Sequence, residues 1–153
     1  MPRKKTPADE TFVVPSRQRP EAQLLSHTAV YAMRAMLMLA RLEPGETARA
    51  TDLARQTGVP LHYLSKVLRR LVESGLLVGQ KGHRGGFCLS RPAIEIRFMD
   101  VLAALDQLPP PNRCAFGWGR CDPQKPCPLH PAWSKLNDAF RAWAGSFTLG
   151  DVT

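Results

Sequence analysis

Apolar side chains recur at helical spacing near the start of the chain. Four of them lie three or four positions apart: Val30, Met33, Leu37 and Ala40. Ser26, just before this stretch, is of a residue type that caps helix N-termini, and the Glu-Pro-Gly run at residues 43–45 ends the pattern. The spacing therefore predicts a helix over residues 26–42.

Two further helices are expected directly after it, with a tight turn between them. The first is short, about residues 51–56, and stops at Gly58, which tolerates the left-handed turn conformation. The next covers about residues 61–74, between Pro60 and Gly75, and turns four apolar side chains inward: Leu64, Val67, Leu68 and Leu71. This arrangement predicts a helix-turn-helix, although an ordinary helical hairpin would need the same residues.

The following runs predict a β-hairpin. Residues 76–80 and 87–90 are short mixed or apolar runs, and the segment that separates them is basic and rich in glycine. A hairpin directly after the third helix is a wing. Residues 24–107 are therefore expected to form a winged-helix DNA-binding domain, with a fourth helix that ends near Gln107. The predicted fold class is mainly α-helical with a small β-hairpin wing.

The last third of the chain is expected to contain a loop and then a helix. Seven of the 14 prolines fall between residues 109 and 131, and because proline lacks an N–H, residues 108–131 should form an irregular loop. Residues 132–153 are assigned to a C-terminal helix and tail, with a stripe at helical spacing: Trp133, Leu136, Phe140, Trp143 and Phe147. Such a stripe commonly packs on its own domain, but here the first four helices already close a core. We therefore expect it to pair with a second subunit as a dimerisation helix.

The distribution of charge changes the interpretation of the helix-turn-helix. The 153 residues carry a formal net charge of +8, and residues 49–91 alone hold eight basic and two acidic side chains. Six of the eight excess charges thus fall on the expected helix-turn-helix and wing. A basic face can simply be solvated, but on this pattern it indicates double-stranded DNA as the partner. Residues 1–23, with four prolines and few apolar groups, are expected to be disordered.

The sequence also bears on location. No apolar run approaches the ~20 residues that a membrane span requires. The basic N-terminus is not followed by the apolar core of a secretory signal. We therefore expect a cytoplasmic protein without membrane contact, in which the four cysteines do not form a disulfide framework.

Three cysteines and one histidine of the loop are residue types that bind metals. Cys114, Cys121 and Cys127 are separated by six and five residues, and His130 lies three positions beyond the last of them. Thiolates bind iron-sulfur clusters and zinc, and an imidazole can be a fourth ligand. Structural zinc sites generally use pairs about two to four residues apart, so the wide gaps favour a cluster. The alternative is a zinc-stabilised DNA-binding or interaction module without cluster sensing, and three unrelated thiols are a third interpretation.

The remaining candidates do not indicate catalysis. Cys88 lies between Phe87 and Leu89 and is expected to be a buried apolar cysteine of the second wing strand. His62 and His83 are expected to be exposed polar contacts of the DNA-reading region. The chain has no C-x-x-C pair and no nucleotide-binding glycine motif, so an enzyme, such as a thiol redox enzyme, is not expected.

These segments resemble the bacterial winged-helix transcriptional regulators of the Rrf-two superfamily, which includes iron-sulfur-sensing IscR-like, NsrR-like and RirA-like members. The resemblance covers about residues 24–152 and is carried by VYAMRAMLMLA, GVPLHYLSKVLRRLVESGLL, KGHRGGF, CAFGWGRCDPQKPCPLHPAW and FTLGDV. It implies a homodimer joined through the C-terminal helix, with the loop beside the other subunit's DNA-binding domain.

The resemblance also implies a ligand set. Cys114, Cys121 and Cys127 match the family's three cluster cysteines, and His130 matches the histidine that completes the two-iron cluster of IscR-like members. NsrR-like members can use an aspartate of the first helix for a four-iron cluster, but the corresponding residue here is Val30, which cannot ligate. The first cysteine gap is six residues rather than the family's more usual five. A [2Fe–2S] cluster is therefore favoured, with [4Fe–4S] as the alternative.

The implied function is transcription regulation, most simply repression, with operator affinity controlled by a cluster that senses nitric oxide, iron-sulfur status or redox stress. Lysine and arginine neutralise phosphates, and an arginine that bonds guanine in bidentate fashion adds ~1–3 kcal/mol of discrimination. The wing departs from the family's usual Arg-Gly-Pro-Gly run, so the operator sequence does not transfer. The expected DNA contacts lie on the third helix and the wing: Tyr63, Ser65, Lys66, Arg69, Lys81 and Arg84.

Overall fold

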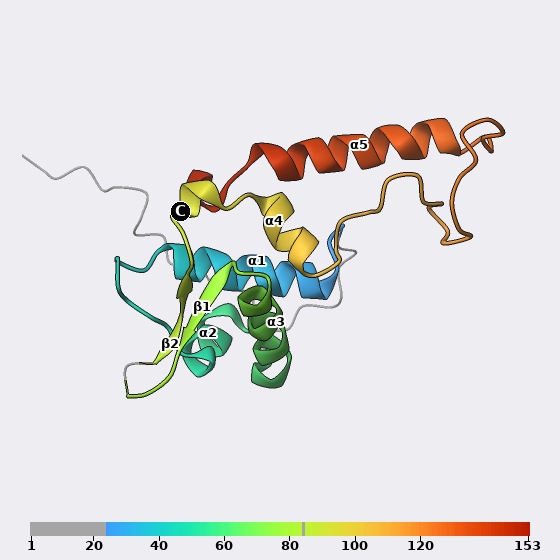
Figure 1. The fold of residues 1–153 in the computed structure, drawn as a ribbon. Helices are drawn as coiled ribbons and strands as arrows, with labels where there is room; N and C mark the ends of the chain where they lie inside the picture. The colour runs from blue at the N-terminus through green and yellow to red at the C-terminus, as the bar shows by residue number, and fades with distance from the viewer. Residues whose placement is uncertain (1–23, 84) are drawn as a thin grey trace, which may run out of the picture.

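The structure, a computed structural model, describes residues 24–83 and 85–153, and its elements follow the expected order (Figure 1). They are α1 (His27–Ala40), α2 (Ala50–Thr57), α3 (Leu61–Glu73), β1 (Leu77–Gln80), β2 (Gly86–Leu89), the 3-10 turn η2 (Ala93–Glu95), α4 (Phe98–Ala104), α5 (His130–Ser146) and the 3-10 turn η3 (Leu149–Asp151). The predicted fold class, mainly helical with a two-stranded hairpin, is confirmed. The expected N-terminal tail and Arg84 lie outside the described residues.

α1 is the central helix of the molecule. It begins where the sequence predicted, because the Oγ of Ser26 accepts a hydrogen bond from the backbone N–H of Ala29. α2, α3 and the hairpin lie on one side of α1, and α4 and α5 lie on the other (Figure 1). The stripe used to predict this helix is only half-buried. The fully buried face of α1 consists mostly of alanines, which let the neighbouring helices approach closely. Its residues are Ala29, Ala32, Ala35, Met36 and Leu39.

The turn between α2 and α3 has the geometry that its residues favour. Gly58 adopts the left-handed conformation, with φ of 69°, and its backbone N–H bonds the carbonyl of Ala54. Pro60 then precedes the first residue of α3, a place where its fixed φ suits the start of a helix. All four apolar residues predicted to face inward from α3 are buried: Leu64, Val67, Leu68 and Leu71.

The hairpin is antiparallel and is fastened to the segment before α2. Leu77 pairs with Leu89 at its base, where Leu77 is buried, and Gln80 pairs with Gly86 near the tip. Phe87 exchanges two backbone hydrogen bonds with Ala48, at 2.8 and 3.0 Å. A Cβ added at Gly86 would lie 2.6 Å from the carbonyl oxygen of Ala48, so this approach requires glycine. Cys88 of β2 is half-buried rather than fully buried.

The C-terminal part of the chain leaves the core and returns to it. α4 ends at Ala104, sooner than predicted, because Asp106 has a positive φ of 55° that no helix can accommodate. Residues 109–129 contain no helix or strand, as expected from their prolines. α5 starts at His130, two residues earlier than predicted, because Pro131 is tolerated in the first turn of a helix.

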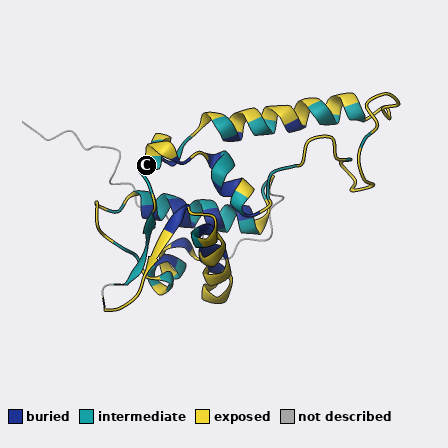
Figure 2. Cartoon of the chain, in the orientation of Figure 1, coloured by how far each residue is buried: buried dark blue, intermediate teal, exposed yellow. Residues whose placement is uncertain are grey.

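Beyond α5, the chain packs into the same core as the winged helix. Leu149 is fully buried, and its N–H donates to the carbonyl of Ile96 at 2.9 Å. The ring of Phe98 contacts those of Trp143 and Phe147, at centroid distances of 5.7 and 6.3 Å. Figure 2 shows the buried positions gathered around α1, with the loop exposed. Within the described residues, no helix has the length and apolar character needed to cross a bilayer.

Candidate nucleic-acid interface and cysteine loop

One face of α3 is exposed and polar. His62, Ser65, Lys66 and Arg69 recur at helical spacing opposite the buried residues of α3, and all four are exposed. The hairpin projects on the same side of α1 as α3, whereas α5 lies on the other side (Figure 1). We call the part of the chain from α1 to α4, with its hairpin, the winged head. The head thus has the two elements with which winged helices contact DNA, a helix and an adjacent hairpin tip.

Two of the expected contact residues on α3 have local partners. The Oγ of Ser65 donates to the carbonyl of Leu61 in its own helix, at 2.8 Å. Arg69 pairs with Glu73 at 2.9 Å, and both side chains are largely exposed. An exposed pair of this kind contributes little to stability, so the guanidinium can exchange Glu73 for a phosphate at small cost. Lys66 is exposed on the same face.

Tyr63 differs from the other candidates on α3. Its hydroxyl is hydrogen bonded to Thr28 of α1 at 2.8 Å. Its ring meets Tyr31 edge-on, with centroids 5.5 Å apart and planes inclined by 83°. The side chain is therefore turned toward α1, although it remains 37% exposed.

The wing tip is held by a residue that the sequence analysis missed. Lys81 and His83 are exposed, as expected for a tip that reaches DNA, and Arg84 lies outside the described residues. The guanidinium of Arg49, just before α2, donates to the carbonyl of His83 at 2.7 Å. Arg49 thus joins the wing to the start of α2. The one feature that could have suggested this role is the position of Arg49, directly after Ala48, which pairs with Phe87.

Backbone hydrogen bonds of the loop place Cys114 near Cys121, and Cys127 near His130. The N–H of Cys114 donates to Gly119 at 3.0 Å, and the N–H of Cys121 donates to Asn112 at 2.9 Å, on either side of an isolated bridge between Arg113 and Arg120. Cys127 accepts a hydrogen bond from the N–H of His130, also at 3.0 Å. Cys114 and Cys121 therefore flank one turn, and Cys127 and His130 share another at the start of α5.

The surroundings of the thiols differ. The backbone N–H of Phe116 lies 3.4 Å from the sulfur of Cys114 and, with the N–H groups of Trp118 and Gly117, lowers the pKa of that thiol. Partial burial raises the pKa of the Cys121 thiol, and the negative charges of Cys114 and Cys127 raise it further. Cys121 is thus the thiol whose charge is influenced by both of the others. The pKa directions therefore favour the thiolate, the form that binds metals, at Cys114 over Cys121.

His130 provides a separate indication of a ligand. Its Nδ1 is buried and has no hydrogen-bond partner in the structure. Buried polar atoms are nearly always paired, so a nitrogen of this kind fits a bound metal. Among residues 24–83 and 85–153, however, no three His, Cys, Asp or Glu side chains are grouped at metal-binding distances. The three cysteines and His130 are residue types that can bind an iron-sulfur cluster or zinc. The loop holds them in one region but does not arrange them as a complete metal site.

α5 holds the first part of the loop through a polar ridge, which we define as Trp133, Asn137 and Arg141. These side chains lie four residues apart and donate to the backbone carbonyls of Arg113, Pro110 and Pro109, at 2.8, 3.2 and 3.1 Å. This role was not predicted, although the spacing of four is visible in the sequence. Trp133, which is also part of the expected dimer stripe, binds the chain next to Cys114 through its indole N–H.

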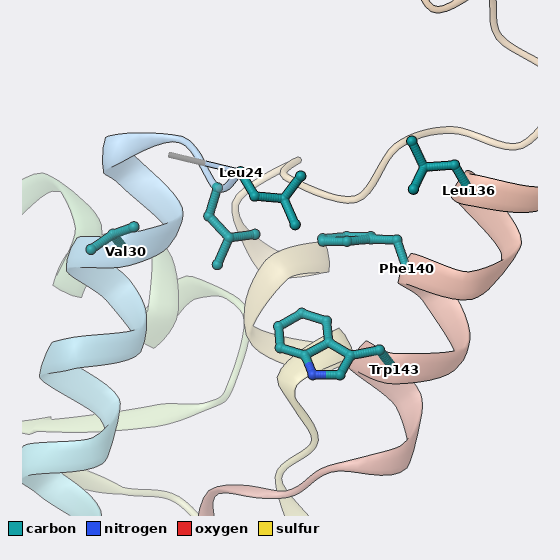
Figure 3. A pocket seen from close by; sticks show the side chains of 6 residues that line it. Leu24, Val30, Leu136, Phe140 and Trp143 are labelled. Carbon is teal, nitrogen blue, oxygen red and sulfur yellow. The ribbon is translucent and has the colours of Figure 1, made fainter. Parts of the chain in front are cut away.

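An apolar groove lies between the start of α1 and α5 (Figure 3). Its volume is about 550 Å³, and it is lined by Leu24, Leu25, Val30, Leu136, Phe140 and Trp143. In Figure 3, Phe140 and Trp143 project from α5 toward Leu24 and the first turns of α1. Leu24 and Leu136 are 85% and 55% exposed, so much of this surface is uncovered in the single chain.

Comparison with known proteins agrees with this arrangement. The model of the Rrf2 family, described as an iron-dependent transcriptional regulator, matches residues 25–153. The HTH-type transcriptional regulators IscR of Cronobacter sakazakii and of Escherichia coli O1:K1 are each 30% identical over 122 residues, which are 80% of this chain and 75% of theirs.

Two solved structures show the same fold. CymR, the global cysteine regulator of B. subtilis, has a TM-score of 0.71 at 21% identity, over 86% of this chain and 96% of that chain. T. potens IscR has a TM-score of 0.67 at 21% identity, over 83% of each chain. The family match spans the winged head, the cysteine loop and α5 together. This chain therefore belongs to the Rrf2 family of winged-helix transcriptional regulators, which are not enzymes.

Proposed function

We propose that this chain is a dimeric repressor whose affinity for its operator is controlled by an iron-sulfur cluster in the loop. The observation that carries the proposal is the buried, unpartnered Nδ1 of His130, which shares a turn with Cys127. Two further thiols lie close enough to influence each other electrostatically. The description of the family as iron-dependent supports iron rather than zinc.

The ligands would be Cys114, Cys121, Cys127 and His130, with [2Fe–2S] favoured and [4Fe–4S] as the alternative. When bound, a cluster supplies a redox-active centre. Its oxidation or loss would report the signal, which is nitric oxide, iron-sulfur status or redox stress. The chain's own contribution is to hold the donors in place. Backbone N–H groups favour the thiolate of Cys114, and the polar ridge of α5 fixes the residues that lead up to it.

Two contacts join the base of the loop, at Leu105 and Asp106, to α3, which we call the reading helix because it is expected to contact DNA. Arg70 of α3 pairs with the carboxylate of Asp106 at 2.6 Å, and its other terminal nitrogen donates to the carbonyl of Leu105 at 3.4 Å. Asp106 lies two residues after the end of α4, where the chain turns into the loop. A change in loop order therefore alters the support of the last turns of α3. A coupling of ~1–3 kcal/mol would change operator affinity about 5- to 150-fold.

The apolar groove favours a second copy of the chain as partner. Leu24, Leu136 and Phe147 are all more than two-fifths exposed, and together with the groove they form a surface that water solvates poorly. A two-fold dimer through α5 would present two heads, which bind two half-sites about 34–36 Å apart. Because the target is chromosomal DNA, the proposed place of action is the cytoplasm.

The test is anaerobic purification and reconstitution with iron and sulfide, followed by measurement of iron, acid-labile sulfide, zinc and visible absorbance. We expect a coloured protein with iron and sulfide, and expect Cys121→Ala to abolish the absorbance and change retention of operator DNA while the head stays folded. Cys88→Ala is the matched control, because Cys88 lies in β2, and it should keep the absorbance. A colourless protein with one zinc would support the zinc module instead. Wild-type absorbance in Cys121→Ala would remove Cys121 from the ligand set.

A further inference from the structure

We propose that Tyr63 acts on DNA binding as a positioning residue, by locking the start of α3 to Thr28 of α1, and that this joint is a second route from the loop to the reading helix. The second part rests on the cluster control proposed above. Our expectation from the sequence was that Tyr63 contacts DNA directly. The geometry points instead to an interaction inside the head.

The contacts of Tyr63 join the first turns of two helices. Thr28 is the second residue of α1, and Tyr63 is the third residue of α3. The hydrogen bond between their hydroxyls measures 2.8 Å, and the ring of Tyr63 also meets Tyr31 edge-on. Both the polar end and the ring of Tyr63 are thus engaged with α1.

The start of α3 has few other attachments. Pro60, its N-cap residue, makes no side-chain capping hydrogen bond. Leu61 and His62 are exposed, and the first buried residue of α3 is Leu64. Apart from Val59, which is buried just before Pro60, the first turn of α3 is held against the molecule by Tyr63, and this turn precedes the exposed face that carries Ser65, Lys66 and Arg69.

The same turn of α1 also touches the base of the loop. Ser26, two residues before Thr28, hydrogen bonds the side-chain carbonyl of Gln107 through its Oγ. Gln107 in turn donates to the carbonyl of Leu105 at 3.0 Å, next to the segment that the polar ridge holds. A change in loop order would therefore displace Ser26, and Thr28 in the same turn would pass this displacement to Tyr63.

A double-mutant cycle separates positioning from direct contact. The variants are Tyr63→Phe, Thr28→Val and their combination, and the probe is a labelled duplex selected by the wild-type protein from a random-sequence pool. If Tyr63 acts through Thr28, each single variant should weaken binding by about three- to tenfold, and the double variant should be no weaker than either single one. Thr28→Ser, which keeps the hydroxyl, should bind within about twofold of wild type.

Tyr31→Phe is the matched control, because phenylalanine keeps the ring that meets Tyr63, and this variant should bind like wild type. Thermal unfolding of each variant checks that the head is intact. Additive losses in the double variant would show that Tyr63 touches DNA itself and would overturn the proposal. A Tyr63→Phe variant with wild-type affinity would overturn it as well.

The link to the loop is tested in the same cycle, with Cys121→Ala added. We expect Cys121→Ala to change the affinity of the wild-type protein by a larger factor than that of the Tyr63→Phe/Thr28→Val variant. Equal factors in both would overturn the link while cluster control stands. If Cys121→Ala changes neither affinity, cluster control and this link both fail. The outcome for Tyr63 as a positioning residue still follows from the cycle without Cys121→Ala.

Discussion

The indole N–H of Trp133 donates a hydrogen bond to the carbonyl of Arg113 at 2.8 Å, and so fastens α5 to the residue before Cys114. Asn137 and Arg141 repeat this contact along the helix, at Pro110 and Pro109. Proline carbonyls are suitable acceptors here, because the loop forms no helix or strand that would use them. One edge of α5 thus supports the loop, and another edge lines the apolar groove.

Asn137→Ala should destabilise the protein, because it removes the buried donor that satisfies the carbonyl of Pro110. We expect the free energy of unfolding to fall by about 1–3 kcal/mol, measured by urea denaturation. Asp138→Ala, an exposed neighbour on the same helix, is the control and should leave the transition midpoint nearly unchanged. Equal midpoints for the two variants would show that Asn137 does not support the loop.

Lys66→Ala should weaken DNA binding and make it less sensitive to salt. Lys66 is exposed on the outward face of α3, where an ammonium group can neutralise one phosphate. We expect the slope of log affinity against log salt concentration to become shallower by about 1, with a similar loss for different DNA sequences. Lys135→Ala on α5 is the matched control. An unchanged slope for Lys66→Ala would place Lys66 outside the interface.

Gly86→Ala should impair the wing. The added Cβ would lie 2.6 Å from the carbonyl oxygen of Ala48, so the two segments must separate. We expect a lower melting temperature and weaker DNA binding. Gly79→Ala in the partner strand is the control, because its Cβ would meet the ring of Phe87 at 3.6 Å, an ordinary contact. Identical behaviour of the two variants would argue against the close pairing with Ala48.

Asp151→Asn should lower stability at neutral pH more than at acid pH. Hydrogen bonds from the backbone and the hydroxyl of Thr148 hold the pKa of Asp151 below its ordinary value of 3.8. The carboxylate therefore stabilises the folded chain at every pH above the ordinary value, and this contribution disappears as the pH falls through the lowered pKa. Melting temperatures of the wild type and the variant should differ at pH 7, and the difference should shrink as the pH falls below 3.8. A constant difference would contradict this role.

Local signals made the winged head predictable. Ser26 as a cap, Gly58 as a left-handed turn and the apolar spacing of α3 each specify geometry within a few residues, and each occurs in the structure as expected. The basic, glycine-rich tip likewise identified the hairpin. These features follow from backbone preference and periodicity, which depend on neighbours in sequence.

The missed features depend on contacts between distant residues. Tyr63 and Thr28 are 35 positions apart, and so are Arg70 and Leu105. Periodicity identified α1 through apolar residues that are half-buried and left out the alanines of its fully buried face, because a small side chain is a weak apolar signal. The direction of a side chain toward a neighbouring helix or toward solvent is set by tertiary packing, which no local pattern reports.

The burial of Leu149 restricts how α5 can move. The chain leaves the core after the buried Leu105 and rejoins it at Ala144 of α5 and at Leu149. The segment between these points is therefore anchored at both ends, so a rearranged loop leaves the end of α5 attached to the core. A chain truncated after Ser146 would lose the anchor at Leu149, and any minimal head made for binding studies needs the last seven residues of the sequence.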